Sequence, residues 1–243
     1  MTLEDNNIHS NAQAGVHVQG EGSEAVVRKN RIHDGKAAGV VIINTAKATL
    51  EDNDIHSNAY ANVSVEGEGS EAVVRNNRIY DGKEAGVVIK DKGKATVNNN
   101  DIHLNDYAGV LVRDEGSEAE IRKNHIHDGK QGGVMICENA TATLNDNTIQ
   151  SNDLYGVGIM EMSLATLTIN HIMGNGHCTI QRTPDELAEW VGGTAAVWLS
   201  GCGLPGVFVE DHSTISMLLG SNTNEGNGKG VGQVVMDSSS QYH

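Results

Sequence analysis

The chain has 243 residues, a formal net charge of −15, 29 glycines, two prolines and 3% aromatic residues. This acidity excludes a nucleic-acid-binding or anionic-membrane-binding protein, because both ligands are negatively charged and are bound through basic surfaces. The scarcity of rings disfavours a broad globular core built on large aromatic side chains.

The expected cellular compartment rests on the absence of a membrane span and of a signal-peptide pattern, and on the cysteines. No stretch approaches the roughly 18 consecutive apolar residues of a membrane span, and the first residues, MTLEDNNIHS, show no signal-peptide pattern. The three cysteines, Cys137, Cys178 and Cys202, are odd in number and lack the spacing of a metal site. We therefore expect free thiols and a cytoplasmic or nuclear protein with no membrane partner.

A repeat of 23 to 24 residues runs from the N-terminus to about residue 180. The tripeptide Asn-x-Ile recurs with isoleucine at positions 8, 32, 55, 79, 102, 126, 149 and 172. A second mark, Gly-Val-x-(Val/Ile), keeps the same phase, with Asn62 in place of the glycine in one copy. Alternating apolar residues between turn residues predict three short strands per repeat. The prediction is a right-handed parallel β-helix of about eight regular coils.

Stacking of the coils turns repeated positions into columns. We expect inward columns of alanine, of Val/Leu/Ile and of isoleucine, and a turn column of asparagines whose amides bond from coil to coil: Asn6, Asn30, Asn53, Asn77, Asn100, Asn124, Asn147 and Asn170. Exposed columns alternate in charge, as in Glu24, Lys47, Glu71, Lys94 and Glu118. Opposite charges therefore face each other across neighbouring coils, which favours a single register.

Two columns of ring-bearing side chains supply the candidate binding residues of the regular coils. Three residues after each asparagine lie His9, His33, His56, Tyr80, His103 and His127. These rings are predicted to point outward as a solvated, stacked ladder, although histidines about 4.8 Å apart are also able to share a transition metal. Tyr60, Tyr107 and Tyr155 recur in alternate coils, either as a strip for sugar or peptide or as anchors of turns.

Beyond residue 180 the repeat weakens. Residues 181–205 are predicted to be an insertion with a short helix at 184–191, where Thr183 is the N-cap and Pro184 the first helical residue. Trp190 and Trp198 in this insertion are further candidate binding residues. Residues 206–243 are predicted to form degenerate last coils and a cap within one domain spanning 1–243. The N-terminal coil begins in mid-repeat, and we expect any self-association to use it.

The repeats offer no evident catalytic chemistry. The irregular third holds His177, Asp185 and Asp211 among other polar residues, but no catalytic triad, phosphate loop or zinc motif can be read there. We therefore predict no catalytic residues, no metal site and no cofactor.

Residues 116–134, GSEAEIRKNHIHDGKQGGV, and the copies at 22–40 and 69–87 resemble the CASH-type β-helix repeat. The resemblance is strongest to the β-helix of substrate-recruiting F-box subunits of ubiquitin ligases, although the F-box and the zinc-binding module are absent. It implies a non-catalytic, protein-binding β-helix. Related repeats also occur in polysaccharide lyases and uronate epimerases.

Two functions follow as expectations. The first is a protein-binding or scaffold β-helix that recognises a partner along a lateral face. The alternative is a carbohydrate-active β-helix enzyme, namely a polysaccharide lyase, uronate epimerase or glycoside hydrolase, with a polysaccharide as ligand.

Overall fold

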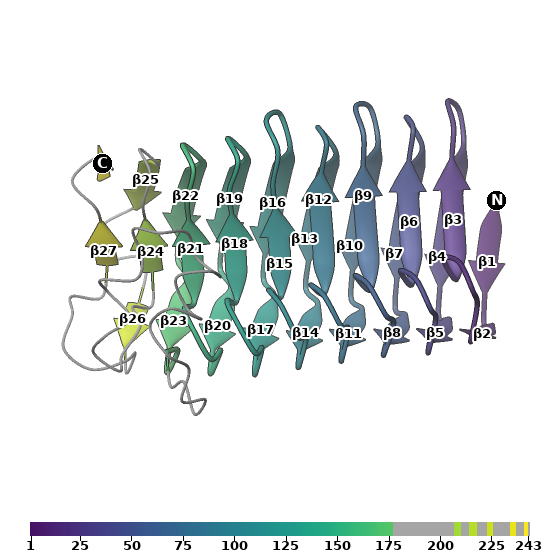
Figure 1. Cartoon of the computed structure of the whole chain (residues 1–243), viewed down its shortest axis with the longest axis horizontal. Coiled ribbons are helices and arrows are strands. Elements are labelled where there is room, and N and C mark those ends of the chain that lie inside the picture. Colours follow the sequence, from purple (N-terminus) through teal and green to yellow (C-terminus); the bar gives the residue numbers. More distant parts are fainter. Residues whose placement is uncertain (177–206, 210–213, 218–222, 226–233, 237–240, 243) are drawn as a thin grey trace.

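The computed structural model describes residues 1–176 and, beyond them, five strands: Val207–Val209, Thr214–Met217, Thr223–Glu225, Val234–Met236 and Gln241–Tyr242. The chain is a right-handed parallel β-helix whose coils stack along the long axis from the N-terminal strand onward (Figure 1). The described residues contain no helix, and so none that is long and apolar enough to cross a membrane. The predicted helix at 184–191, with Trp190 and Trp198, lies outside the described residues.

Each coil contributes one strand to each of three parallel sheets. Sheet A contains β1 (Thr2–Glu4), β4 (Glu24–Arg28), β7 (Lys47–Glu51), β10 (Glu71–Arg75), β13 (Lys94–Asn98), β16 (Glu118–Arg122), β19 (Thr141–Asn145), β22 (Leu164–Thr168), β25 (Thr214–Met217) and β28 (Gln241–Tyr242). Sheet B contains β2 (Asn7–His9), β5 (Arg31–His33), β8 (Asp54–His56), β11 (Arg78–Tyr80), β14 (Asp101–His103), β17 (His125–His127), β20 (Thr148–Gln150), β23 (His171–Met173) and β26 (Thr223–Glu225). Sheet C contains β3 (Val16–Gln19), β6 (Val40–Ile43), β9 (Val63–Glu66), β12 (Val87–Lys90), β15 (Val110–Val112), β18 (Val134–Ile136), β21 (Val157–Ile159), β24 (Val207–Val209) and β27 (Val234–Met236).

The predicted register is confirmed. Ile79 pairs with Ile55 on one side and with Ile102 on the other, and the remaining isoleucines of the column follow the same pattern. From Ile32 to Ile172 these side chains are fully buried, whereas Ile8 in the first coil is only partly buried. Alanine and aliphatic columns of sheet A complete the core, as expected from their alternation with exposed residues.

The asparagine column is confirmed as a hydrogen-bonded ladder inside the turn between sheets A and B. Asn53 is typical: its Oδ1 accepts the backbone N–H of Asn30 at 2.9 Å and the Nδ2 of Asn30 at 3.1 Å. Its own Nδ2 donates to the carbonyl of Val27 at 2.8 Å. The ladder therefore satisfies buried backbone groups that the turn leaves without a strand partner.

A second asparagine column, which the sequence pattern did not reveal, stabilises the turn between sheets B and C. Its members are Asn58, Asn105, Asn152 and Asn175, all almost fully buried. In three other coils the position is Gly35, Gly82 or Gly129, whose N–H donates to Asn58, Asn105 or Asn152 of the next coil at 3.1, 3.0 and 3.0 Å.

Candidate functional site

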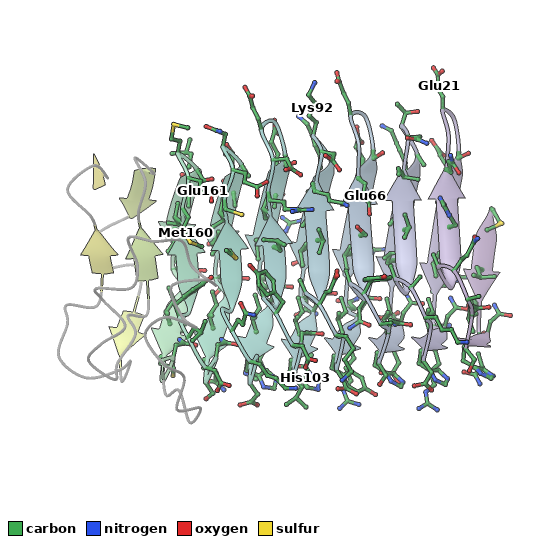
Figure 2. The ribbon with its side chains drawn as sticks, in the orientation of Figure 1. Glu21, Glu66, Lys92, His103, Met160 and Glu161 are labelled. Carbon is green, nitrogen blue, oxygen red and sulfur yellow. The ribbon has the colours of Figure 1, made fainter. Side chains whose placement is uncertain are left out.

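A groove with a volume of about 1240 Å³ runs along the outer face of sheet C, and we call it the sheet C groove. It is lined from Ala12 in the first coil to Glu161, so it crosses many coils at right angles to their strands. One wall consists of the loops that lead from sheet B to sheet C. Figure 2 shows Glu66, Met160 and Glu161 along this face, with His103 on a different edge of the molecule.

The floor of the sheet C groove is apolar over three successive coils, whereas Ser64 and His17 interrupt it toward the N-terminal end. Val88, Leu111 and Met135 point outward from their strands, yet their exposed fractions are only 7%, 9% and 8%, because the wall loops fold over them. With neighbouring wall residues they form an apolar cluster separate from the main core: Ala61, Ala85, Val88, Ala108, Leu111, Met135, Cys137, Leu154, Tyr155 and Met160. Toward the N-terminal end the floor is more open at Val41.

The three predicted tyrosines differ in how far they are exposed. Tyr60 is 54% exposed on the groove wall, and Tyr107 lines the groove while packing against the apolar cluster. Tyr155 is only 3% exposed. A Cβ atom on Gly132 would lie 2.2 Å from the Tyr155 ring, so the glycine makes room for this ring under the surface. Tyr60 and Tyr107 can therefore contact a ligand, whereas Tyr155 supports the wall.

Charged residues of the groove are largely paired with one another. Lys90 Nζ lies 3.4 Å from Glu66 Oε2, and Asp106 contacts both Lys130 at 2.6 Å and Lys83 at 3.8 Å. Each pair joins successive coils, so the pairs hold neighbouring coils together along the groove. Exposed pairs of this kind each contribute about 0–1 kcal/mol to stability.

One end of the groove gathers a thiol and carboxyl groups. Cys137 Sγ and the carboxylates of Glu138 and Glu161 lie within 4.8 Å of one another. Burial raises the pKa of the Cys137 thiol to about 12, so it is protonated and unreactive at neutral pH. A hydrogen bond to Asp114, aided by partial burial, raises the pKa of Glu138. A protonated thiol is a poor nucleophile, so this end of the groove does not favour thiol catalysis.

The histidine column on sheet B is stacked as predicted. Centroids of successive rings from His9 to His127 lie 4.7 to 5.2 Å apart. The expectation of a solvated ladder is wrong for most of the rings, because stacking on both faces shields them. The side chains of His33, His56 and His103 are 11%, 8% and 8% exposed, and that of His127 is 17% exposed. Burial lowers the pKa of His56 and His103.

The rings also share a hydrogen-bond rule. In four of them Nδ1 meets the side chain of the next residue, which is Ser10 at 3.1 Å, Asp34 at 2.6 Å, Ser57 at 3.0 Å or Asp128 at 2.7 Å. His103 breaks this rule because Leu104 follows it. Its Nδ1 is buried and has no hydrogen-bond partner.

Two neighbouring coils bring a cluster of acid–base groups together around Asp101. One carboxylate oxygen of Asp101 lies 2.9 Å from His127 Nε2 and 3.6 Å from His125 Nδ1, and the other lies 3.5 Å from His103 Nδ1. Sequence reasoning missed this cluster because Asp101 and His125 belong to an exposed charged column, which was assigned to fixing the register rather than to a site. The available signal was the tripeptide His125-Ile126-His127, which follows Asp101-Ile102-His103 by one repeat.

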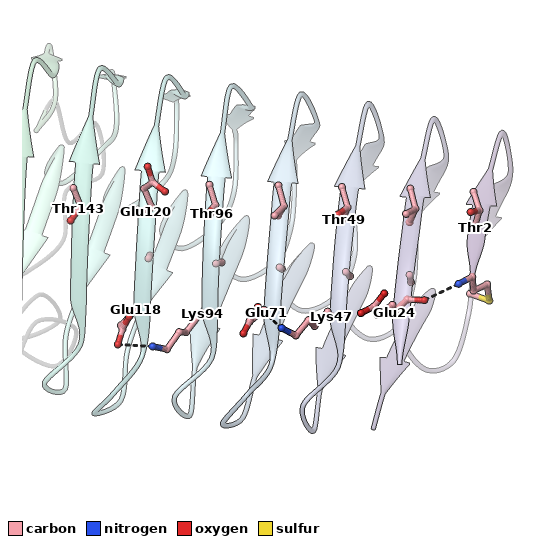
Figure 3. Close-up of a pocket in the computed structure, with 18 of the residues that line it drawn as sticks. Thr2, Glu24, Lys47, Thr49, Glu71, Lys94, Thr96, Glu118, Glu120 and Thr143 are labelled. Atoms are coloured by element: carbon pink, nitrogen blue, oxygen red, sulfur yellow. Dashed lines mark hydrogen bonds and ion pairs between the residues drawn. The ribbon is translucent and has the colours of Figure 1, made fainter. Parts of the chain in front are cut away.

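Sheet A carries a shallower groove of about 990 Å³ on its outer face (Figure 3). Its floor alternates Val26, Thr49, Val73, Thr96 and Glu120. Along one side, Lys47 pairs with Glu71 and Lys94 with Glu118, each at 2.9 Å, which confirms the expected facing of opposite charges. Since these charges neutralise one another, the face offers a ligand little beyond alternating small side chains.

The fold and groove define a right-handed parallel β-helix with an open lateral groove. The chain belongs to the right-handed β-helix region family, which it matches over residues 1–122 and 84–243. No curated protein matches the chain.

Several solved structures share the fold at low sequence identity. Pectate lyase Pel9A superposes with a TM-score of 0.62 at 11% identity, covering 99% of this chain and 69% of the lyase. A double mutant of the periplasmic alginate epimerase AlgG gives 0.57 at 16% identity, with 92% and 60% coverage. The A-module of mannuronan C-5 epimerase AlgE6 from Azotobacter vinelandii gives 0.52 at 16% identity, with 95% and 63% coverage. The chain thus spans about two thirds of these proteins, and at such identities the likeness concerns the fold.

Proposed function

We propose that this chain is a protein-binding β-helix that holds an extended segment of a partner protein in the sheet C groove. The observation that carries the proposal is the floor of the groove, where Val41, Ser64, Val88, Leu111 and Met135 follow one another from coil to coil, all but Ser64 are apolar, and charged residues border them. An apolar floor with a polar rim is typical of peptide-binding surfaces. Methionine on the floor adds adaptability to different side chains.

The dimensions of the groove suit an extended segment. The lining residues span six coil steps, or about 30 Å at the spacing of β-strands. An extended chain of about nine residues covers this length. The net charge of −15 favours a basic partner, because it attracts positive charge over long distances.

Further features agree with a binding role. The one cysteine of the groove is protonated at neutral pH, so the groove lacks an activated thiol among its described residues. The likeness of the repeats to those of substrate-recruiting F-box subunits also supports protein recognition. With it we propose a cytoplasmic or nuclear location, where a partner protein rather than a secreted polymer would be met.

Selection from a phage-displayed library of random peptides of about 12 residues tests the proposal. We expect enrichment of peptides that combine basic and apolar residues, and a loss of affinity of about tenfold or more in Tyr60→Ala. Val41→Lys, which places a charge on the floor of the groove, should abolish binding. Val26→Lys, at a residue 37% exposed on sheet A, is the matched control and should bind as the wild type does. Peptides that bind all variants equally, or no enrichment at all, would contradict the proposal.

A carbohydrate-active enzyme is the second candidate. Asp101 Oδ1 lies 2.9 Å from His127 Nε2, within hydrogen-bonding range, and 3.6 Å from His125 Nδ1, so acid–base groups gather at one place. The names of the solved structures with this fold, an epimerase of alginate and a pectate lyase among them, favour this candidate over the first. Against it stand the acidity of the chain, which repels anionic polysaccharides, and the position of the cluster outside both grooves.

Turnover of pectate and alginate decides between the candidates. We expect no unsaturated product in the ultraviolet assay for lyases and no change in the uronate composition of alginate by NMR. Activity that is lost in His127→Tyr, a substitution with a precedent in the same column at Tyr80, would replace the first proposal by the second.

A further inference from the structure

We infer that Asp101, His103 and His127 form a binding site for a transition metal ion of the zinc class. The site lies on sheet B, outside the sheet C groove, and it is independent of the function proposed above. One carboxylate oxygen and two imidazole nitrogens, all within 4.8 Å of one another, make up its ligands. Imidazole and carboxylate together are the donor set that Zn²⁺ and its neighbours in the first transition row prefer.

The state of one ring nitrogen of His103 favours a metal site. The side chain is 8% exposed, and its Nδ1 is buried without a hydrogen-bond partner. A buried polar atom in this state destabilises the folded chain unless something binds it. The rings of His9, His33, His56 and His127 avoid the cost through the serine or aspartate that follows each of them. At His103 the following residue is Leu104, so the lone pair stays available to a metal ion.

The spacing of the ring nitrogens around Asp101 also suits a metal ion. Its carboxylate oxygens lie 2.9 Å from His127 Nε2 and 3.5 Å from His103 Nδ1. Two ligand atoms bound to one tetrahedral Zn²⁺ are about 3.3 Å apart, since each lies about 2.0–2.1 Å from the metal. The shorter distance belongs to Oδ1 and the longer to Oδ2, so the carboxylate turns one oxygen toward each imidazole. One oxygen and the two nitrogens lie within 4.8 Å of one another, and side-chain rotations that close this spacing would bring them around one ion.

Asp128 orients the His127 ring for metal binding. Its Nδ1 lies 2.7 Å from Asp128 Oδ2, while its Nε2 faces Asp101. A carboxylate that accepts the N–H of a histidine fixes the tautomer and leaves the other nitrogen as a metal ligand. A metal ion between Nε2 and Asp101 would accept a lone pair from each of them.

The other coils show what the site depends on. In the first pair of coils Asn7 occupies the position of Asp101, and its Oδ1 contacts His33 Nε2 at 2.9 Å. In the next pair Tyr80 occupies the position of His127. Among residues 1–176, only the coils of Asp101 and His127 combine the carboxylate, both histidines and the hydrophobic residue after the first of them. The Asp101 side chain is 44% exposed, so an ion in solution can reach the cluster.

Titration calorimetry of the tag-free chain with zinc chloride tests the site. We expect one Zn²⁺ per chain and X-ray absorption that shows two imidazole ligands. Asp101→Asn recreates the arrangement of Asn7, so it should leave the fold intact and weaken binding at least about tenfold. Leu104→Ser supplies His103 with the hydroxyl partner that Ser57 gives His56, and should weaken binding by about 10- to 100-fold.

His33→Gln is the matched control, because it changes the same column in the coil pair that lacks the carboxylate, and it should bind Zn²⁺ as the wild type does. Circular dichroism of each variant verifies the fold. Absence of Zn²⁺ binding by the wild-type chain would overturn the inference. So would equal affinity of the wild type, Asp101→Asn and Leu104→Ser, since the metal would then be bound elsewhere.

Discussion

His56 illustrates how the stack controls the protonation of its rings. Its Nε2 accepts a hydrogen bond from Arg31 Nε at 3.2 Å, so its proton resides on Nδ1, which donates to Ser57 Oγ at 3.0 Å. Ser57 in turn donates to Asp81 Oδ2 at 2.9 Å. Every donor in this chain of contacts has an acceptor only while the ring is neutral. A second proton on His56 would face the Arg31 guanidinium.

This geometry predicts that the protein loses stability as the pH falls. Burial is the main reason that the pKa of His56 lies below its ordinary value, so the unfolded chain binds a proton before the folded chain does. The stabilisation is complete above the unfolded pKa of about 6.5 and is lost as the pH falls through the folded pKa. Urea unfolding between about pH 7 and pH 5 should show a slope of at most about 1.4 kcal/mol per pH unit from this residue.

His56→Tyr, which copies Tyr80 of the next coil, provides the control for this prediction. The variant should be less sensitive to pH in that range. Both proteins should still lose stability at lower pH, where carboxylates with lowered pKa values such as Glu4 and Asp34 become protonated. An identical pH profile for the wild type and the variant would contradict the role assigned to His56.

At the scale of the turns, the sequence predicts one asparagine ladder and conceals the other. The first ladder has an asparagine in every coil, so its period is visible. The second alternates between asparagine and glycine, as in Gly35, Asn58, Gly82 and Asn105, and an alternation of unlike residues does not register as a repeat. Asn62 accounts for the glycine at one position of this alternation. Its amide fills the space beside Gly82, where a Cβ would lie 2.8 Å from Asn62 Nδ2.

Replacement of Asn62 by the glycine that its repeat position usually holds should therefore destabilise the protein. Asn62 Nδ2 donates to the carbonyl of Tyr80 at 3.0 Å and to Asn105 Oδ1 at 3.1 Å. Loss of these buried contacts in Asn62→Gly should lower the free energy of unfolding by about 1–3 kcal/mol. Asn139→Gly is the control, because Asn139 is exposed with φ 62° and glycine tolerates that conformation. Chemical denaturation compares them, and equal midpoints would refute the role of Asn62.

At the scale of the whole molecule, periodicity makes the fold predictable and hides the candidate site. Each column of the core follows from a spacing of 23 to 24 residues, since a coil must return to the same place. The sheet C groove depends instead on how far loops fold over outward side chains such as Leu111, which no spacing reveals. The cluster around Asp101 depends on two columns meeting in one pair of coils. The tryptophans and the predicted helix of residues 181–205 lie outside the described part of the chain.

The stack of coils predicts that equal substitutions have unequal costs along its length. Ile102 is fully buried between Ile79 and Ile126, so Ile102→Ala leaves a cavity bounded on both sides and should cost about 2–5 kcal/mol. Ile8 belongs to the first coil and pairs with Ile32 alone, so Ile8→Ala should cost only about 1–2 kcal/mol. Neighbouring coils stabilise one another in a solenoid, which makes a mid-stack defect the more damaging. Urea unfolding of both variants measures the difference, and an equal loss would show that the coils unfold as one unit regardless of position.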